Sequence, residues 1–193
     1  MGRPPCLYTW SKQGRYGSNS LRVEEMETPL EHVLMAFNKE GMIAYMESHP
    51  GDFEAAVKLA TGDKQPYSWR AAWLLWSVLQ QDDPRLKPYI RVILDCIPGK
   101  KDGHQRELIK MLGLMELDEA HEGVFFNLCM NLWEKTHAAP SVRYTALKVI
   151  IRIAKKYPEL FNDVRLVTQD HYLETLSPGV RSSVCRMVDG LGH

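Results

Sequence analysis

The 193-residue sequence contains no run of about 18 apolar residues, the length that a membrane-spanning helix needs. Its longest nearly uncharged stretch, residues 71–81, is shorter and fits a buried helix. The first residues also lack the apolar core of a secretory signal peptide and the residue pattern of a myristoylation signal. We therefore expect no membrane partner and a cytoplasmic location.

Cysteine is scarce, and its spacing argues against the common cysteine-based sites. The four cysteines are Cys6, Cys96, Cys129 and Cys185, and no two of them form a Cys-x-x-Cys pair. Zinc sites and disulfide frameworks usually show closer, paired cysteines. Cys96, Cys129 and Cys185 stand among apolar residues at helical spacing, where a thiol behaves as a small hydrophobe. We predict that these three are buried free thiols.

Local catalytic signatures are also absent from the sequence. It contains no P-loop, no Gly-x-Ser-x-Gly turn, no His-Glu-x-x-His motif and no Gly-x-Gly-x-x-Gly motif. The acidic segment 118–122 includes a histidine, but no second histidine follows at metal-ligand spacing. Acids at a helix start are explained by capping and by the helix dipole. The sequence therefore predicts a protein that is not an enzyme and has no cofactor.

Strand signals are missing as well, whereas helix start and stop signals recur along the chain. No alternating run of β-branched and aromatic residues ends in a two-residue turn. Thr28-Pro29-Leu30-Glu31 is a capping-box pattern with proline at the first helical position. We expect an all-α protein of roughly ten helices joined by short loops. The expected helices cover 53–61, 69–81, 89–97, 102–117, 118–135 and 141–156, and others start at Pro29, after Asn38, near Asn162 or Asp163, and at Pro178.

The first 25 residues differ from the rest of the chain. Gly, Pro, Ser, Arg and Asn dominate them, and neither a helical nor a strand period is sustained. We predict that residues 1–25 form a flexible N-terminal tail. Residues 26–193 are expected to form a single helical domain.

An internal repeat is the most informative pattern in the sequence. Arg70, Arg106, Arg143 and Arg181 each stand in the first turn of an expected helix, and they are 36, 37 and 38 residues apart. One further helix and two short loops separate successive copies, which is the layout of a two-helix repeat. A guanidinium in this position can reach an acid or a loop carbonyl of the next repeat, so we expect these arginines to tie neighbours together. The alternative is that they line a ligand surface.

This repeat resembles those of the HEAT-like and armadillo-like α-solenoid families. The resemblance depends on the period and on the segments Val142-Arg143-x-x-Ala146-Leu147 and Val180-Arg181. It implies a superhelix of about four to five antiparallel helix pairs, with repeats of about 37 residues. The repeats are clearest over residues 68–193, and residues 28–67 fit as degenerate leading helices. Such repeats serve as scaffolds, adaptors, nucleic-acid binders and enzyme subunits, so the resemblance leaves the function open.

Aromatic residues form the first candidate site. Trp69, Trp73 and Trp76 are spaced to share one helix face, and Tyr67 stands just before them. They fit a groove for a peptide or an exposed base. The alternative, which we favour, is a core helix packed by large side chains.

Basic residues form the second candidate site, on the helix expected at 141–156. Lys148, Arg152, Lys155 and Lys156 lie on its polar side. This face resembles the basic surface of HEAT-like DNA alkylation repair glycosylases, which would contact phosphates. Residues 24–134 carry a net charge of −8, against +4 in each flanking segment, so an extensive basic surface is not evident. A solvated helix face is the simpler interpretation.

Three functions follow from these patterns. The leading hypothesis is a non-catalytic scaffold or adaptor that binds another protein in the groove between its helix layers. The first alternative is a nucleic-acid-binding solenoid, based on the basic face and the tryptophans. The second is a small-molecule enzyme with a pocket at the tryptophans.

Overall fold

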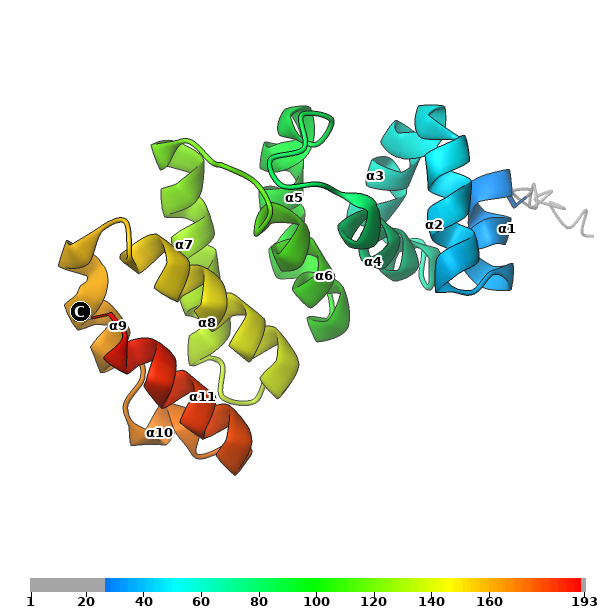
Figure 1. Cartoon of the computed structure of the whole chain (residues 1–193). Coiled ribbons are helices and arrows are strands. Elements are labelled where there is room, and N and C mark those ends of the chain that lie inside the picture. Colours follow the sequence, from blue (N-terminus) through cyan, green and yellow to red (C-terminus); the bar gives the residue numbers. More distant parts are fainter. Residues whose placement is uncertain (1–26, 192–193) are drawn as a thin grey trace, which may run out of the picture.

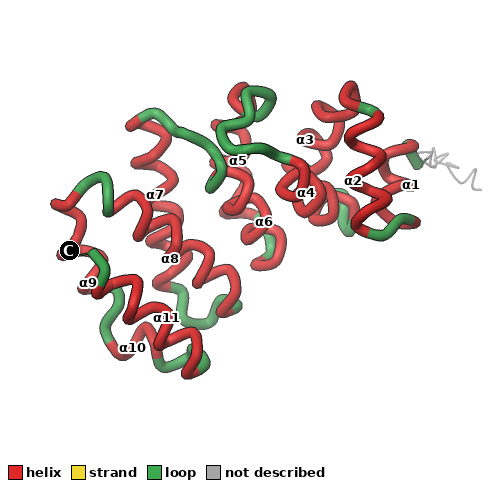
Figure 2. The backbone as a smooth tube through the Cα atoms, viewed as in Figure 1, coloured by secondary structure: helices red, strands yellow, loops and turns green. Residues whose placement is uncertain are grey.

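The computed structural model describes residues 27–191, and these residues form a stack of five helical units (Figure 1). The helices are α1 (Pro29–Ala36), α2 (Lys39–Ser48), α3 (Phe53–Thr61), α4 (Tyr67–Val78), α5 (Ile90–Cys96), α6 (Asp102–Leu112), α7 (Glu119–Glu134), α8 (Pro140–Ala154), α9 (Phe161–Leu166), α10 (Asp170–Leu173) and α11 (Pro178–Asp189). The described part of the chain contains no strand (Figure 2), so the all-α prediction is confirmed. The predicted tail, residues 1–25, lies outside the described residues.

The units form two layers of helices. In the pairs α3–α4, α5–α6 and α7–α8, the second helix packs directly on the second helix of the next pair, and α8 also packs on α11. The first helices α3, α5 and α7 contact one another less, so the stack bends with the second helices inside the curve (Figure 1). We call α4, α6, α8 and α11 the inner layer, and α3, α5, α7, α9 and α10 the outer layer. The prediction of an α-α superhelix of four to five helix pairs is confirmed.

Several helices begin at the residues that the sequence indicates, because short polar side chains there bond free N–H groups. The Thr28 hydroxyl accepts from the N–H of Glu31 at 3.2 Å, and the Glu31 carboxylate accepts from the N–H of Thr28 at 3.0 Å. Asn38 caps α2, and Asp118 caps α7. The capping pattern therefore predicts these three helix starts. Helix α4 starts at Tyr67 rather than at Trp69, and α8 at Pro140 rather than at Ser141, and neither has a side-chain cap.

Helix ends depart further from the predictions. Helix α4 ends at Val78 rather than at Gln81, and α6 ends at Leu112 rather than near Leu117. The loops that follow these helices bond to each other: the N–H of Asp82 donates to the Leu114 carbonyl at 2.8 Å. Asp82 has a φ of 50°, in the left-handed region that ends regular helix. Pairing between the two loops thus replaces the last helical turns.

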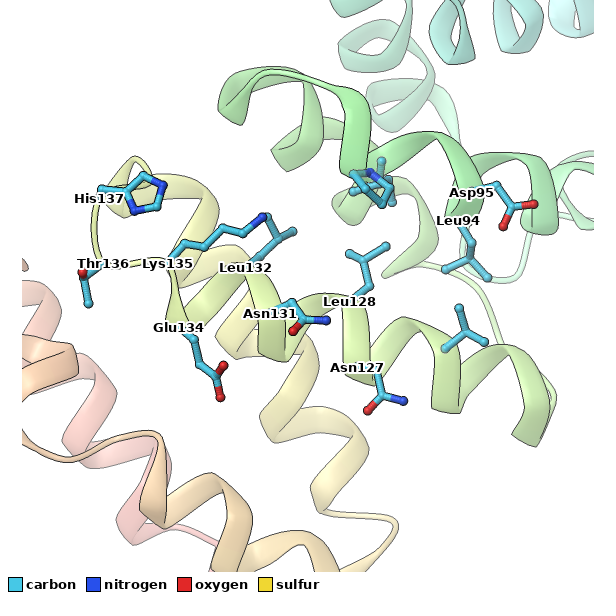
Figure 3. Close-up of a pocket in the computed structure, with 13 residues that line it drawn as sticks. Leu94, Asp95, Asn127, Leu128, Asn131, Leu132, Glu134, Lys135, Thr136 and His137 are labelled. Atoms are coloured by element: carbon cyan, nitrogen blue, oxygen red, sulfur yellow. The ribbon is translucent and has the colours of Figure 1, made fainter.

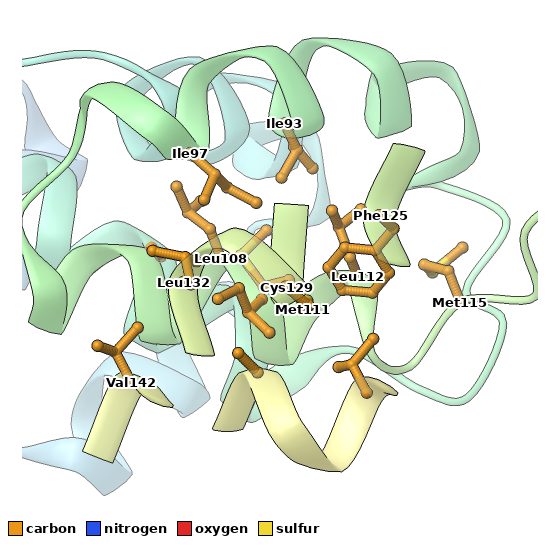
Figure 4. Packing of buried hydrophobic residues seen from close by; sticks show 14 of the residues in the cluster. Ile93, Ile97, Leu108, Met111, Leu112, Met115, Phe125, Cys129, Leu132 and Val142 are labelled. Carbon is orange, nitrogen blue, oxygen red and sulfur yellow. The ribbon is translucent and has the colours of Figure 1, made fainter. Parts of the chain in front are cut away.

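The central core lies between α5, α6, α7 and α8 (Figure 4). Leu108, Met111, Phe125 and Cys129 are fully buried there, and each comes from the apolar face of its helix. One helix pair cannot cover both of its apolar faces, so stacking of neighbouring pairs makes the core continuous.

The three described cysteines are free thiols, but they differ in burial. Cys129 is buried, as predicted, and Cys96 is half-buried. The prediction is wrong for Cys185, which is exposed. Cys185 lies on α11, and in residues 27–191 no further helix pair packs on that end of the stack. Cys6 lies outside the described residues.

Candidate binding surface on the inner layer

The tryptophan stripe lies along α4 and is half-buried. Trp69, Trp73 and Trp76 all keep intermediate exposure, and the last two pack partly against the core. The hydroxyl of Tyr67 donates to the Glu27 carboxylate at 3.0 Å. The stripe is therefore neither a fully buried core face nor an open groove, and its members have different surroundings.

A pocket of about 220 Å³ opens where α4, α6 and α8 meet, and we call it the inner pocket. It has apolar, aromatic and basic walls, and none of its lining residues is acidic. The residues that line it are Trp76, Ile109, Lys110, Gly113, Leu114, Thr145, Lys148, Val149 and Arg152. The structure thus brings one predicted tryptophan together with two residues of the predicted basic face.

Lys110 was not singled out from the sequence, yet it lines this pocket. Its Nζ lies 3.5 Å from the centroid of the Trp76 ring and 2.5 Å from a carboxylate oxygen of Glu107. Glu107 is fully buried, and Arg106 binds it as well at 2.6 Å. One carboxylate is therefore shared by two cations. Lys110 follows Trp76 by 34 residues and precedes Lys148 by 38. Both separations are close to the length of one repeat, and this spacing could have indicated from the sequence that Lys110 lies beside them.

Lys148 and Arg152 lie one turn apart on α8 and complete the basic rim. A guanidinium nitrogen of Arg152 donates to the carbonyl of Gly113, in the turn after α6. Lys148 is exposed, and its Nζ lies 4.6 Å from the centroid of the Tyr144 ring. Within residues 27–191 neither cation lies within 4.0 Å of a carboxylate. Both are therefore available to an incoming anion.

The other half of the predicted basic face lies elsewhere. The Nζ of Lys156 is 2.7 Å from a carboxylate oxygen of Glu122 on α7. The hydroxyl of Tyr157 donates to the same carboxylate at 3.1 Å, and this bond raises the pKa of Tyr157. Lys155 is exposed beyond the end of α8 and does not line the inner pocket. The four predicted residues do not form one continuous surface.

Two of the repeat arginines contact neighbouring units. Arg70 on α4 donates from Nε to the carbonyl of Leu34 on α1, and its Nη2 lies 3.9 Å from the sulfur of Met42 on α2. Arg143 on α8 donates to the carbonyl of Tyr172 on α10 at 2.7 Å. These contacts join consecutive pairs.

The other two repeat arginines bond within their own units. Arg106 binds Glu107, the next residue on α6. Arg181 on α11 donates to the carbonyls of Leu176 at 3.0 Å and Glu174 at 2.5 Å, both in the preceding loop. The same sequence position thus has different partners along the stack.

Charge is divided between the two layers. The inner-layer helices carry eight basic and three acidic side chains, a net +5. The outer-layer helices carry three basic and seven acidic side chains, a net −4. Successive helices of the chain alternate between the two layers. The net charge of a continuous stretch of sequence therefore mixes both layers and does not show this difference.

A larger groove of about 930 Å³ lies on the outer layer between α5 and α7 (Figure 3). Leu94 and Asp95 approach it from α5, and Asn127 and Asn131 from α7. Asp95, Glu134 and Lys135 give it charges of both signs. It was not predicted, although two asparagines four residues apart inside a helix are a signal, since asparagine is a weak helix former.

The acidic segment at the start of α7 has a structural explanation. A carboxylate oxygen of Asp118 accepts from the N–H of His121 at 2.9 Å, and the other lies 2.7 Å from the His121 Nδ1. Among residues 27–191 no group of three or more His, Cys, Asp or Glu side chains is placed to hold a metal ion. Nor does any helix in that range have the length and apolar character needed to cross a membrane.

Comparison with known proteins agrees with this architecture. A family model described as HEAT repeat domain matches residues 26–191, a range that includes all eleven described helices. No curated protein and no solved structure matches the chain. The match covers most of the sequence, and the chain therefore belongs to the HEAT repeat domain family.

Proposed function

We propose that this chain is a non-catalytic scaffold that binds another protein along its inner layer. HEAT repeats commonly form protein-interaction surfaces, because the curved stack presents an extended concave face. The observation that carries the proposal is the inner pocket. It combines apolar side chains, one tryptophan and three basic side chains on a layer of net positive charge.

The size of the inner pocket favours a macromolecular partner. Pockets that enclose a drug-sized molecule typically measure about 300–1,000 Å³. At about 220 Å³ the inner pocket is smaller, and residues of three inner-layer helices line it. A protein that places one side chain in the pocket gains further contact area along the neighbouring helices.

Affinity capture from extract of the native cells tests this proposal. Thr145→Trp fills the inner pocket, and Val92→Trp makes a matched change at an exposed position on outer-layer helix α5. We expect the wild type and V92W to retain the same saturable protein partner and T145W to lose it. Unchanged melting temperatures of both variants are the control for folding. Equal capture by T145W and V92W would contradict the proposal.

Nucleic-acid binding is the second candidate function, because the inner-layer helices carry eight basic side chains. Phosphate contacts give binding that weakens steeply as salt concentration rises. The test is a titration of labelled duplex and single-stranded oligonucleotides at low salt. Binding that is lost in K148Q and falls steeply with salt would support this candidate, and no binding at low salt would exclude it.

A further inference from the structure

We infer that the inner pocket binds an acidic peptide segment: one apolar side chain enters the pocket, and adjacent carboxylates pair with Lys148 and Arg152. This inference rests on the proposed function and specifies the chemistry of the partner. It follows from the pocket lining, in which apolar side chains such as Ile109 and Val149 are buried and the basic side chain of Lys148 is exposed.

The apolar part of the pocket fits one large side chain. Its apolar lining includes Ile109 and Val149, which are buried, and Leu114 and Trp76, which are half-buried. An apolar cavity of about 150 Å³ is large enough to hold a benzene molecule. A pocket of about 220 Å³ therefore accommodates a phenylalanine or leucine side chain.

The basic part of the pocket fits carboxylates on either side of that apolar residue. Lys148 and Arg152 are four residues apart on one face of α8, and no carboxylate of residues 27–191 lies within 4.0 Å of either. Lys110 adds a third cation beside them, with one shared counter-charge from Glu107. Charge-assisted bonds to carboxylates are stronger than neutral hydrogen bonds, so acidic residues suit this rim.

The same geometry disfavours a nucleic acid. Lys110 lies 3.5 Å from the centroid of the Trp76 ring, so it covers one face on which a base would stack. Arg143 is fully buried, and Arg106 and Lys110 share Glu107. Few cations of the inner layer thus remain to contact successive phosphates, whereas a peptide with two or three carboxylates needs no more.

Fluorescence anisotropy with designed peptides tests the inference. The probe is a short fluorescein-labelled peptide with one phenylalanine flanked on both sides by glutamates. One control peptide has glutamine in place of each glutamate, and the other has serine in place of phenylalanine. We expect saturable binding of the probe and much weaker binding of both control peptides. One control lacks the carboxylates that pair with the basic residues, and the other lacks the apolar side chain that enters the pocket.

Two matched variants of the protein test whether the probe peptide binds at the inner pocket. Lys148→Gln removes an exposed rim cation, and Lys155→Gln makes the same change near the end of α8, outside the pocket. We expect K148Q to weaken probe binding roughly three- to tenfold, as loss of a partly exposed charge-assisted contact does, and K155Q by less than about twofold. Both side chains are exposed, so neither change should alter folding.

The outcomes separate this inference from the proposed function. Equal binding of the glutamate and glutamine peptides, or equal effects of K148Q and K155Q, would overturn the acidic-peptide assignment. Displacement of the probe by a single-stranded oligonucleotide that binds more tightly would overturn it in favour of nucleic acid. If the glutamate and glutamine peptides bind equally, or K148Q and K155Q have equal effects, T145W can still fail to capture the protein partner from extract. In that event the scaffold function stands and only the class of ligand is wrong.

Discussion

The Arg143 guanidinium lies over the Trp133 indole, with 4.7 Å from Cζ to the ring centroid, and its Nε donates to the Trp133 carbonyl at 2.9 Å. Both side chains are fully buried. Arg143 also donates to the Thr175 hydroxyl and the Tyr172 carbonyl, each at 2.7 Å. Burial lowers the pKa of Arg143, yet a guanidinium stays charged in proteins. A buried cation satisfied by neutral acceptors therefore joins the last two units.

Replacement of Arg143 by lysine is expected to lower the free energy of unfolding by about 3 kcal/mol, because an ammonium cannot reach all three acceptors. Chemical denaturation measures this change. Arg106→Lys is the matched control, and we expect it to cost less than about 1 kcal/mol because Arg106 is partly exposed and Lys110 still binds Glu107. Equal denaturation midpoints for R143K and the wild type would contradict this account.

Stability is expected to depend on pH through His104. Its Nε2 lies 2.7 Å from the carbonyl of Ala60, which only accepts, so Nε2 carries the proton and Nδ1 accepts from Gln65. Burial lowers the pKa of His104 below its ordinary value of 6.5, so the folded protein holds this ring neutral. The unfolded chain binds the proton more readily, and the free energy of unfolding falls as pH drops below about 6.5.

Denaturation at a series of pH values measures this dependence. His104→Gln retains a donor for the Ala60 carbonyl and has no ionisable ring, so we expect its stability to vary less between neutral and mildly acidic pH. His171→Gln is the control, since His171 is exposed. A wild-type slope that persists unchanged in H104Q would rule out His104 as its source.

Thiol reactivity should follow the burial of the three described cysteines. In a Cys6→Ser background we expect a disulfide reagent to modify exposed Cys185 fast, half-buried Cys96 slowly, and Cys129 only on unfolding. The thiolate is the reactive form, and burial raises the pKa of both Cys96 and Cys129. Mass spectrometry of the labelled protein gives the order, and early modification of Cys129 would contradict the packing of α7 in the core.

Part of the fold followed from local signals, because capping side chains mark the starts of α1, α2 and α7. The start of α10 at Asp170 has no side-chain cap and was not predicted. Thr28, Asn38 and Asp118 cap helices where the sequence indicates. Helix ends were predicted less well, since the bond between Asp82 and Leu114 joins two loops about 30 residues apart and has no local signature.

The inner pocket was not predicted from the sequence either, because it too depends on how segments far apart in the chain pack together. The repeat period shows which helices correspond, but not how far each is rotated about its axis when the units stack. Trp76 and Lys148 were therefore assigned to separate candidate sites, although both line one pocket. Lys156 was grouped with Lys148 on one face, yet packing places it against Glu122.

Site-specific photo-crosslinking tests most directly whether the inner layer is the binding surface. A photoreactive phenylalanine derivative is placed at Ser141, an exposed residue one turn from Thr145 on α8, or at Val124, which lines the outer groove. With the captured partner present, we expect a covalent protein adduct from position 141 and none from position 124. An adduct from position 124 alone, or equal yields from both positions, would contradict binding along the inner layer.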